Sequence, residues 1–223
     1  MKKICAVMPA HNEEKNIVGV IRGVMKYNID VVVIDDGSED NTARLAKASG
    51  AVILTHDTRK GKGASLKDGL DWAMASGYDY IITIDSDGQH NPDEIPSFIS
   101  VANTDHATGV IIGNRLINYG KMPLVRICTN RFMSSLISAL CKQQIPDTQC
   151  GYKLIKKDVL KNISIKSKKF EIESEILVKA AKVGFKIASI PIKSIYANEK
   201  SNINPVIDTL RFIRFLAGIM REK

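Results

Sequence analysis

The sequence predicts an α/β fold: an open, mostly parallel sheet flanked by helices. Short runs of β-branched residues alternate with longer amphipathic stretches through the first half of the chain. This order is typical of parallel strands joined by right-handed helical crossovers. Each unusual polar cluster of that half follows a predicted strand, which is where such sheets bind ligands. With 223 residues, 44% of them hydrophobic, the chain is long enough to bury one substantial core.

In the first half, four apolar runs predict strands, and three amphipathic stretches predict the helices between them. The predicted strands are residues 4–8, 31–34, 52–54 and 80–84. The predicted helices are residues 13–27, 41–49 and 64–75. Pro9 is expected to end the first strand, and Asn12 offers a side-chain oxygen that can cap the first helix.

In the second half of the chain, apolar runs and amphipathic stretches alternate less regularly. Further strands are predicted at residues 110–112 and 187–196, and helices at 123–141, 156–162 and 171–183, with a loop at 147–152. Pro205 stands where a proline favourably opens a last helix. Because the sequence contains neither a repeat nor a linker, we expect one domain over residues 1–200, followed by a C-terminal helix over 201–223.

The charge and cysteine content narrow the class of protein. Lysine and arginine number 32 against 24 acidic residues, a formal charge of +8, which favours an anionic partner such as a phosphorylated metabolite or a lipid surface. Aromatic residues make up only 6% and do not interleave with basic runs, so nucleic acid is not expected. The four cysteines lack CxxC spacing, which predicts free thiols in a reducing cytoplasm rather than a zinc site. We expect neither a signal peptide nor a membrane span, because no 18 apolar residues run together.

The sharpest feature is Asp85-Ser86-Asp87. Two carboxylates one residue apart, at the end of a buried strand, can hold a hard divalent cation whose other ligands are water and substrate oxygens. Such a cation typically bridges a nucleotide diphosphate and stabilises it as a leaving group. The structural alternative is an Asx turn that caps Gly88. The apolar run before the pair and Gln89 after it favour the metal.

Two other clusters are suited to binding a nucleotide. In Asp35-Asp36-Gly37-Ser38, Asp36 can accept hydrogen bonds from the ring nitrogens of a base, and helix capping is the alternative role, above all for Asp35. Lys60-Gly61-Lys62-Gly63 places two cations and two glycines before a helix, which suits an anion. This second cluster lacks the P-loop spacing, and it would equally fit a plain surface turn.

Seven motifs stand in a characteristic order along nearly the whole chain. Those of the first half are Pro9-Ala10-His11-Asn12-Glu13, Ile34-Asp35-Asp36-Gly37-Ser38, Lys60-Gly61-Lys62-Gly63 and Asp85-Ser86-Asp87-Gly88-Gln89. Those of the second half are Gly113-Asn114-Arg115, Asp147-Thr148-Gln149-Cys150-Gly151-Tyr152 and Ser189-Ile190-Pro191-Ile192. The first four resemble the motifs of inverting family 2 glycosyltransferases of GT-A fold. The last three are similar to the dolichol-phosphate mannosyltransferase branch, which includes polyprenyl-phosphate sugar synthases.

The resemblance implies a role for each matched residue. Residues 1–200 would form a GT-A catalytic domain whose nucleoside pocket is lined by Pro9, Ala10, Asn12, Glu13 and Asp36, with Lys60 and Gly63 beside it. Asp85 and Asp87 would coordinate Mg²⁺ or Mn²⁺ on the diphosphate, with Gln89 in the same shell or on the sugar. The donor phosphates or the acceptor phosphate would face Arg115 and Arg126.

The implied reaction moves a sugar, with inversion, from a nucleotide-sugar donor of GDP-mannose or UDP-glucose type to a polyprenyl or dolichyl phosphate. A lipid phosphate is anionic at neutral pH, so it needs cations to place it rather than a base. A sugar or other hydroxyl acceptor is the alternative, for which Asp147 or Glu173 would supply the base. After the late strand the branch often has an Arg and a Gly before a Ser-Lys pair. This chain instead has Tyr196-Ala197-Asn198-Glu199-Lys200-Ser201, which leaves the sugar and the lipid open.

Residues 201–223 predict an amphipathic helix that either lies in a membrane interface or packs on the core. Arg211, Arg214 and Arg221 share one narrow face, and apolar residues surround the rest of the helix. An arginine near anionic lipid contributes roughly 1 kcal/mol to membrane binding. We therefore expect a cytoplasmic protein, peripheral on the cytoplasmic face of the membrane. Whether a membrane protein partner takes part is left open.

Two other classes of protein fit the sequence less well. A nucleotidyltransferase would carry a glycine-rich N-terminal loop, where this chain has residues 9–13. A non-catalytic binder of membranes or nucleic acid would rely on the charge alone and would have no need of Asp85 and Asp87.

Overall fold

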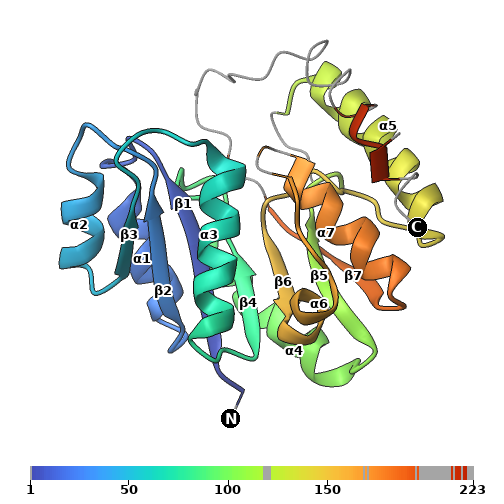
Figure 1. The fold of residues 1–223 in the computed structure, drawn as a ribbon, viewed down its shortest axis with the longest axis horizontal. Coiled ribbons are helices and arrows are strands. Elements are labelled where there is room, and N and C mark those ends of the chain that lie inside the picture. The colour runs from blue at the N-terminus through green and yellow to red at the C-terminus, as the bar shows by residue number, and fades with distance from the viewer. Residues whose placement is uncertain are drawn as a thin grey trace.

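The part of the chain that the structure describes folds around one seven-stranded sheet (Figure 1). The computed structural model describes residues 2–117, 122–167, 169, 171–193, 195, 212, 214–216 and 218–219. The strand order is β3-β2-β1-β4-β6-β5-β7. All neighbouring strands are parallel except β6, which runs antiparallel to both β4 and β5. The predicted α/β class with a mostly parallel sheet is therefore confirmed.

The first half of the chain forms the parallel part of the sheet. Its strands are β1 (Ile4–Ala10), β2 (Asp30–Asp35), β3 (Val52–Thr55) and β4 (Tyr80–Thr83). The helices between them are α1 (Ile17–Met25), α2 (Thr42–Ala48) and α3 (Lys62–Ala75). The inner strands are buried on both faces of the sheet, and all four residues of β4, for example, are buried. The edge strand β3 is partly exposed.

The second half completes the sheet with β5 (Thr108–Asn114), β6 (Lys153–Lys156) and β7 (Lys186–Pro191). The 3₁₀ turn η1 (Pro92–Glu94) leads into α4 (Ile95–Thr104), and the later helices are α5 (Leu124–Cys141), α6 (Lys157–Asn162) and α7 (Glu171–Lys182). In Figure 1, α3 and α7 lie in front of the sheet and α5 packs beyond α7.

Glycine 69 explains how closely α3 approaches the sheet. A Cβ atom at this position would lie 2.4 Å from Val7 Cγ1 and 2.5 Å from Ile34 Cδ1. Only a residue without a side chain lets the helix backbone come this near to β1 and β2. The close approach holds the N-terminal end of α3 beside the ends of those strands, where the pocket described below lies.

Some local expectations were wrong. Strand β1 continues through Pro9 to Ala10, and α1 begins only at Ile17, with Asn16 rather than Asn12 at its N-cap position. Asn12 has φ 57° and instead contacts the loop after β2: its N–H donates to Ser38 Oγ (3.0 Å), and its Oδ1 accepts from the Glu39 N–H (2.9 Å). Strand β6, η1 and α4 were not predicted, and β7 ends at residue 191 rather than 196.

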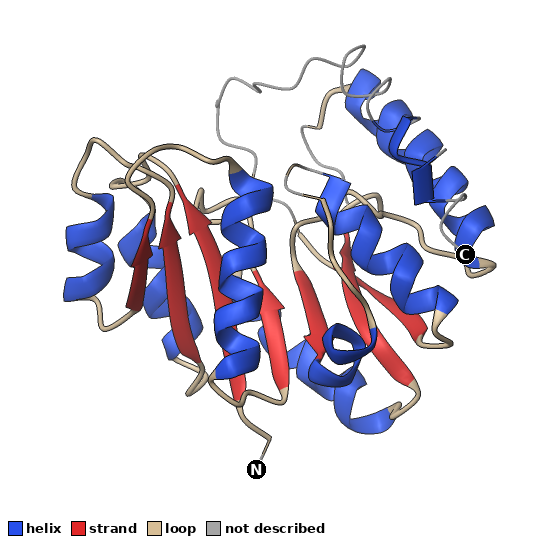
Figure 2. Ribbon diagram, in the orientation of Figure 1, coloured by secondary structure: helices blue, strands red, loops and turns tan. Residues whose placement is uncertain are grey.

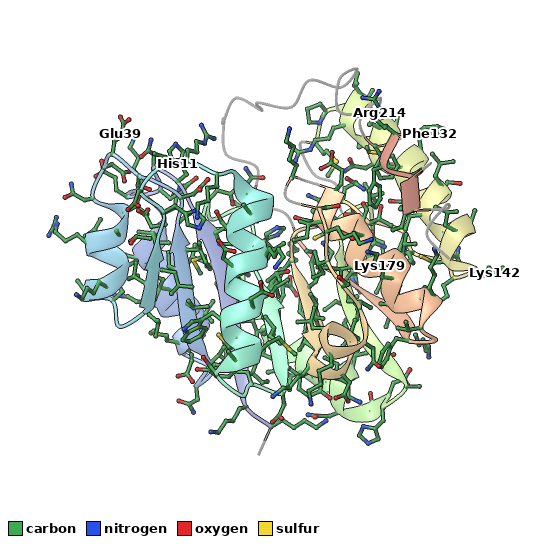
Figure 3. All side chains as sticks on the ribbon, in the orientation of Figure 1. His11, Glu39, Phe132, Lys142, Lys179 and Arg214 are labelled. Carbon is green, nitrogen blue, oxygen red and sulfur yellow. The ribbon has the colours of Figure 1, made fainter. Side chains whose placement is uncertain are left out.

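Most of the predicted C-terminal helix lies outside the described residues, including Arg211 and Arg221. Among those that are described, Phe212, Leu216 and Ile219 are buried in the main core, whereas Arg214, labelled in Figure 3, is exposed. Lys182 Nζ on α7 donates a hydrogen bond to the Ile219 carbonyl (2.8 Å). Within the described part of the chain, no helix is both long and apolar enough to cross a bilayer.

Candidate active site

A pocket of about 180 Å³ opens at the edge of the sheet where β1, β2 and β4 end. Because these three strands are parallel, the loops that follow them meet at one edge (Figure 2). The side chains around the pocket come from these loops and from the start of α3. They are Pro9, Ala10, His11, Glu13, Asp36, Arg59, Lys62, Ser65, Asp85, Ser86 and Asp87.

Asp36 is the most firmly held carboxylate of the pocket. Its Oδ1 accepts hydrogen bonds from His56 Nδ1 and from the Lys60 N–H, each at 2.8 Å, and its Oδ2 accepts one from the Gly61 N–H at 2.7 Å. Burial opposes the ionisation of Asp36, but these hydrogen bonds outweigh it and lower the pKa of the carboxyl group. Among the residues that the structure describes, Oδ2 accepts only the hydrogen bond from the Gly61 N–H. Since a carboxylate oxygen can accept two, a second position on Oδ2 is open to a ligand.

The glycine after Asp36 lets two loops pack against each other. Gly37 has φ 67°, and a Cβ atom there would lie 3.0 Å from the Arg59 nitrogen. The chain after β2 is thereby brought against the segment of Lys60 and Gly61 whose N–H groups bind Asp36. Lys60 thus acts through its backbone, and its side chain is exposed.

Asp85 and Asp87 both line the pocket at the end of β4. Ser86 between them donates from Oγ to the Pro9 carbonyl (2.8 Å), which ties this turn to β1. Asp87 Oδ1 accepts a hydrogen bond from the Gln89 N–H (2.9 Å). Burial raises the pKa of Asp87, and the negative charge of Asp85 raises it further.

A line of alternating charges leads from Asp85 into the core. Lys62 Nζ lies 2.6 Å from Asp85 Oδ1 and 3.3 Å from Glu173 Oε1, and Lys153 Nζ lies 2.7 Å from Glu173 Oε2. Burial alone would lower the pKa of Lys62, but the adjacent carboxylates raise it above its ordinary value. Burial likewise opposes the ionisation of Asp85, and Lys62 reverses this and lowers its pKa. The same pairing with Lys153 and Lys62 lowers the pKa of Glu173, although burial opposes its ionisation.

The side chains of the pocket can supply some, but not all, of the ligands of a divalent metal ion. Asp85 and Asp87 offer hard oxygen ligands, and a cation would relieve the repulsion that raises the pKa of Asp87. Across the described residues, no group of three or more acidic, histidine or cysteine side chains is arranged to hold a metal ion. The two carboxylates would therefore need diphosphate and water oxygens to complete the coordination shell.

Arg115 lies outside the lining of the pocket, paired with a buried carboxylate. Its Nε and Nη2 donate to Asp147 Oδ2 and Oδ1 at 2.8 and 3.0 Å, and its N–H donates to Oδ2 at 3.1 Å. Asp147 is fully buried, and Arg115 is 5% exposed. Asp147 therefore anchors its own loop to the end of β5. Arg126 is half-buried in the first turn of α5 and also lies outside the lining.

Six of the predicted site residues come together in the pocket. They are Pro9, Ala10, Glu13, Asp36, Asp85 and Asp87. Six others are not among its lining residues: Asn12, Lys60, Gly63, Gln89, Arg115 and Arg126. Sequence reasoning gave no site role to His11, Arg59, Ser65 or Ser86, which do line it. Lys62, which also lines it, was predicted only as one of two cations in a motif that suits an anion. Lys62 had a usable signal, because it stands in the same glycine-rich motif as Lys60. His11, which lines the pocket, is labelled in Figure 3.

The fold and the acidic pocket at its edge are those expected of a glycosyltransferase of GT-A fold. The family model described as "Glycosyl transferase family 2" matches residues 5–164, and the chain belongs to this family. This confirms the family that the motifs predict.

Named relatives agree with the branch of the family that the second-half motifs indicate. The UDP-N-acetylglucosamine–dolichyl-phosphate N-acetylglucosaminyltransferase of Methanococcus voltae is 32% identical over 218 residues, covering 87% of this chain and 86% of its own. The undecaprenyl-phosphate mannosyltransferase of Micrococcus luteus is 28% identical, covering 85% and 82%. Among solved structures, the glucosyl-3-phosphoglycerate synthase of Mycobacterium tuberculosis, in complex with Mn²⁺ and UDP, has a TM-score of 0.74. It is 20% identical and covers 96% of this chain and 76% of its own, a likeness of fold alone.

Proposed function

We propose that the protein transfers a sugar from a nucleotide-sugar donor to a polyprenyl or dolichyl phosphate, with inversion and with the help of Mg²⁺ or Mn²⁺. The donor is of the GDP-mannose or UDP-glucose type. The names of the two relatives above support a lipid-phosphate acceptor. Because those names carry different sugars, they do not select the sugar for this chain.

The donor side of the proposal rests on the charges of the pocket. Asp36 would use the open position on Oδ2 to accept a hydrogen bond from a ring nitrogen of the base. Asp85 and Asp87 would hold the cation, which when bound supplies positive charge to the departing diphosphate. Lys62 already lies in the pocket lining beside Asp85, so its ammonium group can add charge for a phosphate.

The proposal of a phosphate acceptor rests on the ion pairs of the two carboxylates that could act as a base. Asp147 is fully buried in the ion pair with Arg115, and Glu173 is paired with both Lys62 and Lys153. A hydroxyl acceptor needs a base that can take its proton. Both carboxylates that the sequence offers for this task are engaged by cations, which favours an acceptor that is already deprotonated.

The reaction of such an acceptor balances without any proton transfer. An oxygen of the lipid phosphate forms a bond to the anomeric carbon, on the face opposite the diphosphate. The bond from that carbon to the diphosphate oxygen breaks, and the nucleoside diphosphate leaves with the electron pair. One displacement inverts the configuration at the anomeric carbon. The protein's own task is then to orient the two anions and to offset their charge.

A lipid acceptor implies contact with a membrane, and we place this protein at the cytoplasmic face. The contact would use residues 201–223, for which the exposed Arg214 is one basic group. Phe212, Leu216 and Ile219 of the same segment pack into the core, so this contact would be peripheral. A membrane protein partner would be an addition to this arrangement and is not required by it.

The test is sugar transfer from radiolabelled GDP- and UDP-sugars to a short polyprenyl phosphate, with Mn²⁺. We expect a product that extracts into organic solvent and that disappears with EDTA and with Asp87→Asn. The matched control is Asp71→Asn, an exposed carboxylate of α3, which should leave transfer unchanged. Donor binding without lipid product would move the acceptor to a hydroxyl. Failure to bind any of these donors would overturn the proposal.

A further inference from the structure

One buried histidine links the pocket to the outer side of α3 and has no part in the function proposed so far. His56 follows β3 and is 8% exposed. Its Nδ1 lies 2.8 Å from Asp36 Oδ1, and its Nε2 lies 3.0 Å from Asp68 Oδ2. The His56 N–H also donates to the Asp35 carbonyl (2.9 Å), which fixes the backbone beside the end of β2.

Both contacts of the ring are made to carboxylate oxygens. An ionised carboxylate only accepts hydrogen bonds, so the two contacts are both hydrogen bonds only when both ring nitrogens carry a proton. The lowered pKa of Asp36 agrees with an ionised partner on the pocket side. Asp68, whose side chain is 46% exposed, provides a second negative charge from α3. A positively charged ring between the two would bind each of them through a charge-assisted hydrogen bond.

We infer that His56 and Asp68 are positioning residues for the nucleotide: they hold the carboxylate of Asp36 in the orientation that receives the base. This rests on the proposed function, in which Asp36 accepts a hydrogen bond from the nucleoside. His56 itself is not among the residues that line the pocket, so it acts through Asp36. The ligand class is a base whose ring carries an N–H donor, as uracil and guanine do.

The effect of His56 depends on which carboxylate oxygen of Asp36 accepts a hydrogen bond from each donor. Without His56, Oδ1 would keep only the Lys60 N–H, and Oδ2 only the Gly61 N–H. The carboxylate could then turn about its Cβ–Cγ bond or draw in water. Fixing a binding group beforehand improves affinity because less freedom is lost when the ligand binds. Loss of His56 should therefore weaken nucleotide binding more than it weakens the fold.

Two substitutions separate the two contacts of the ring. The Nδ2 of asparagine takes roughly the place of histidine Nδ1, and the Nε2 of glutamine roughly that of histidine Nε2. His56→Asn thus keeps the contact to Asp36, whereas His56→Gln keeps only the contact to Asp68. We would measure the dissociation constants of UDP and of GDP by calorimetry with Mn²⁺, together with the melting temperature of each variant. His106→Gln is the matched control, because His106 is exposed.

For the nucleotide that the unaltered protein binds, His56→Gln should raise the dissociation constant by about tenfold or more. His56→Asn should stay within about threefold, although both variants lower the melting temperature alike. Asp68→Asn should raise the dissociation constant by a few-fold at an unchanged melting temperature.

Three other results would overturn the inference, and one of them would overturn the proposed function as well. Unchanged binding by His56→Gln would overturn the inference and leave the proposed function standing. Equal losses in His56→Asn and His56→Gln would also overturn it, because a packing role would then explain the effect. If the unaltered protein bound neither UDP nor GDP, the proposed function would fail, and the inference with it.

Discussion

Replacing Arg115 with methionine tests whether this residue serves the fold or the reaction. Met keeps much of the side-chain length but removes two of the three hydrogen bonds to Asp147, those at 2.8 and 3.0 Å. Asp147 is fully buried, so its charge would lose its ion-pair partner, which typically costs about 3–5 kcal/mol. The backbone N–H of residue 115 still donates to it, which places the expected loss of unfolding free energy near 3 kcal/mol. In a chain of this size that lowers the melting temperature by about 6–12 °C.

The assay is urea unfolding followed by circular dichroism, with sugar transfer measured on the same samples. The double variant Arg115→Met, Asp147→Leu removes the unpaired charge and should recover about half of the loss or more. Recovery should stay incomplete, because the N–H of residue 115 then lacks its acceptor. Unchanged unfolding free energy together with lost transfer would refute this reasoning. It would show that Arg115 works on the phosphates, as the sequence motifs imply.

Three further substitutions test the packing and the charges of the site. Gly69→Ala should lower the unfolding free energy by about 1–3 kcal/mol, because the new methyl group would lie 2.4 Å from Val7 Cγ1; equal urea midpoints would contradict this. Gly151→Ala places a Cβ atom 2.9 Å from Asp85 Oδ2. Calorimetry should therefore show weaker binding of Mn²⁺ with UDP, at little cost in stability. An unaltered affinity would count against a role of Asp85 in metal binding. Burial opposes the ionisation of Asp36, yet its hydrogen bonds lower its pKa below the ordinary 3.8. The stability that it contributes is therefore complete above that value and disappears as the pH falls through the lowered pKa. Unfolding measured between about pH 5 and pH 2 should accordingly show the advantage over Asp36→Asn shrinking, and an advantage that grew in acid would reverse the sign of the argument.

The first four strands could be predicted because the signal is local. Each is a short apolar run, and in β1, β2 and β4 burial on both faces demands such a run and a polar cluster follows it. Strand β6 could not be predicted in the same way. It consists of only four residues, with lysine at both ends, and Lys153 is nevertheless 1% exposed. What makes that burial tolerable is Glu173, a partner on a helix further along the chain.

The same distinction separates the predicted site residues that line the pocket from those whose partners lie elsewhere in the fold. Asp36, Asp85 and Asp87 follow directly from the rule that parallel strands bring their ends to one edge. The partners of Arg115 and Lys62 depend on which distant carboxylate the fold brings near, and no local pattern carries that information. The motifs predict a bound anion near each of these cations, and the structure pairs each with carboxylates of the protein. Only the structure shows that for Arg115 the anion is Asp147, a residue of the protein itself.

The alternating charges beside the pocket suggest how it accommodates a metal ion and a donor together. Asp85, Lys62, Glu173 and Lys153 are two negative and two positive groups in contact, so the line as a whole is neutral. A divalent cation adds two positive charges and the diphosphate of a nucleotide sugar adds two negative ones, so their joint arrival leaves the balance unchanged. Asp87 adds a further carboxylate beside Asp85, so a cation alone finds a partner there. A diphosphate alone would meet negative charge that only the cation offsets. The electrostatics of the pocket therefore favour binding of the donor together with the cation, with Lys62 free to share its charge between Asp85 and the diphosphate.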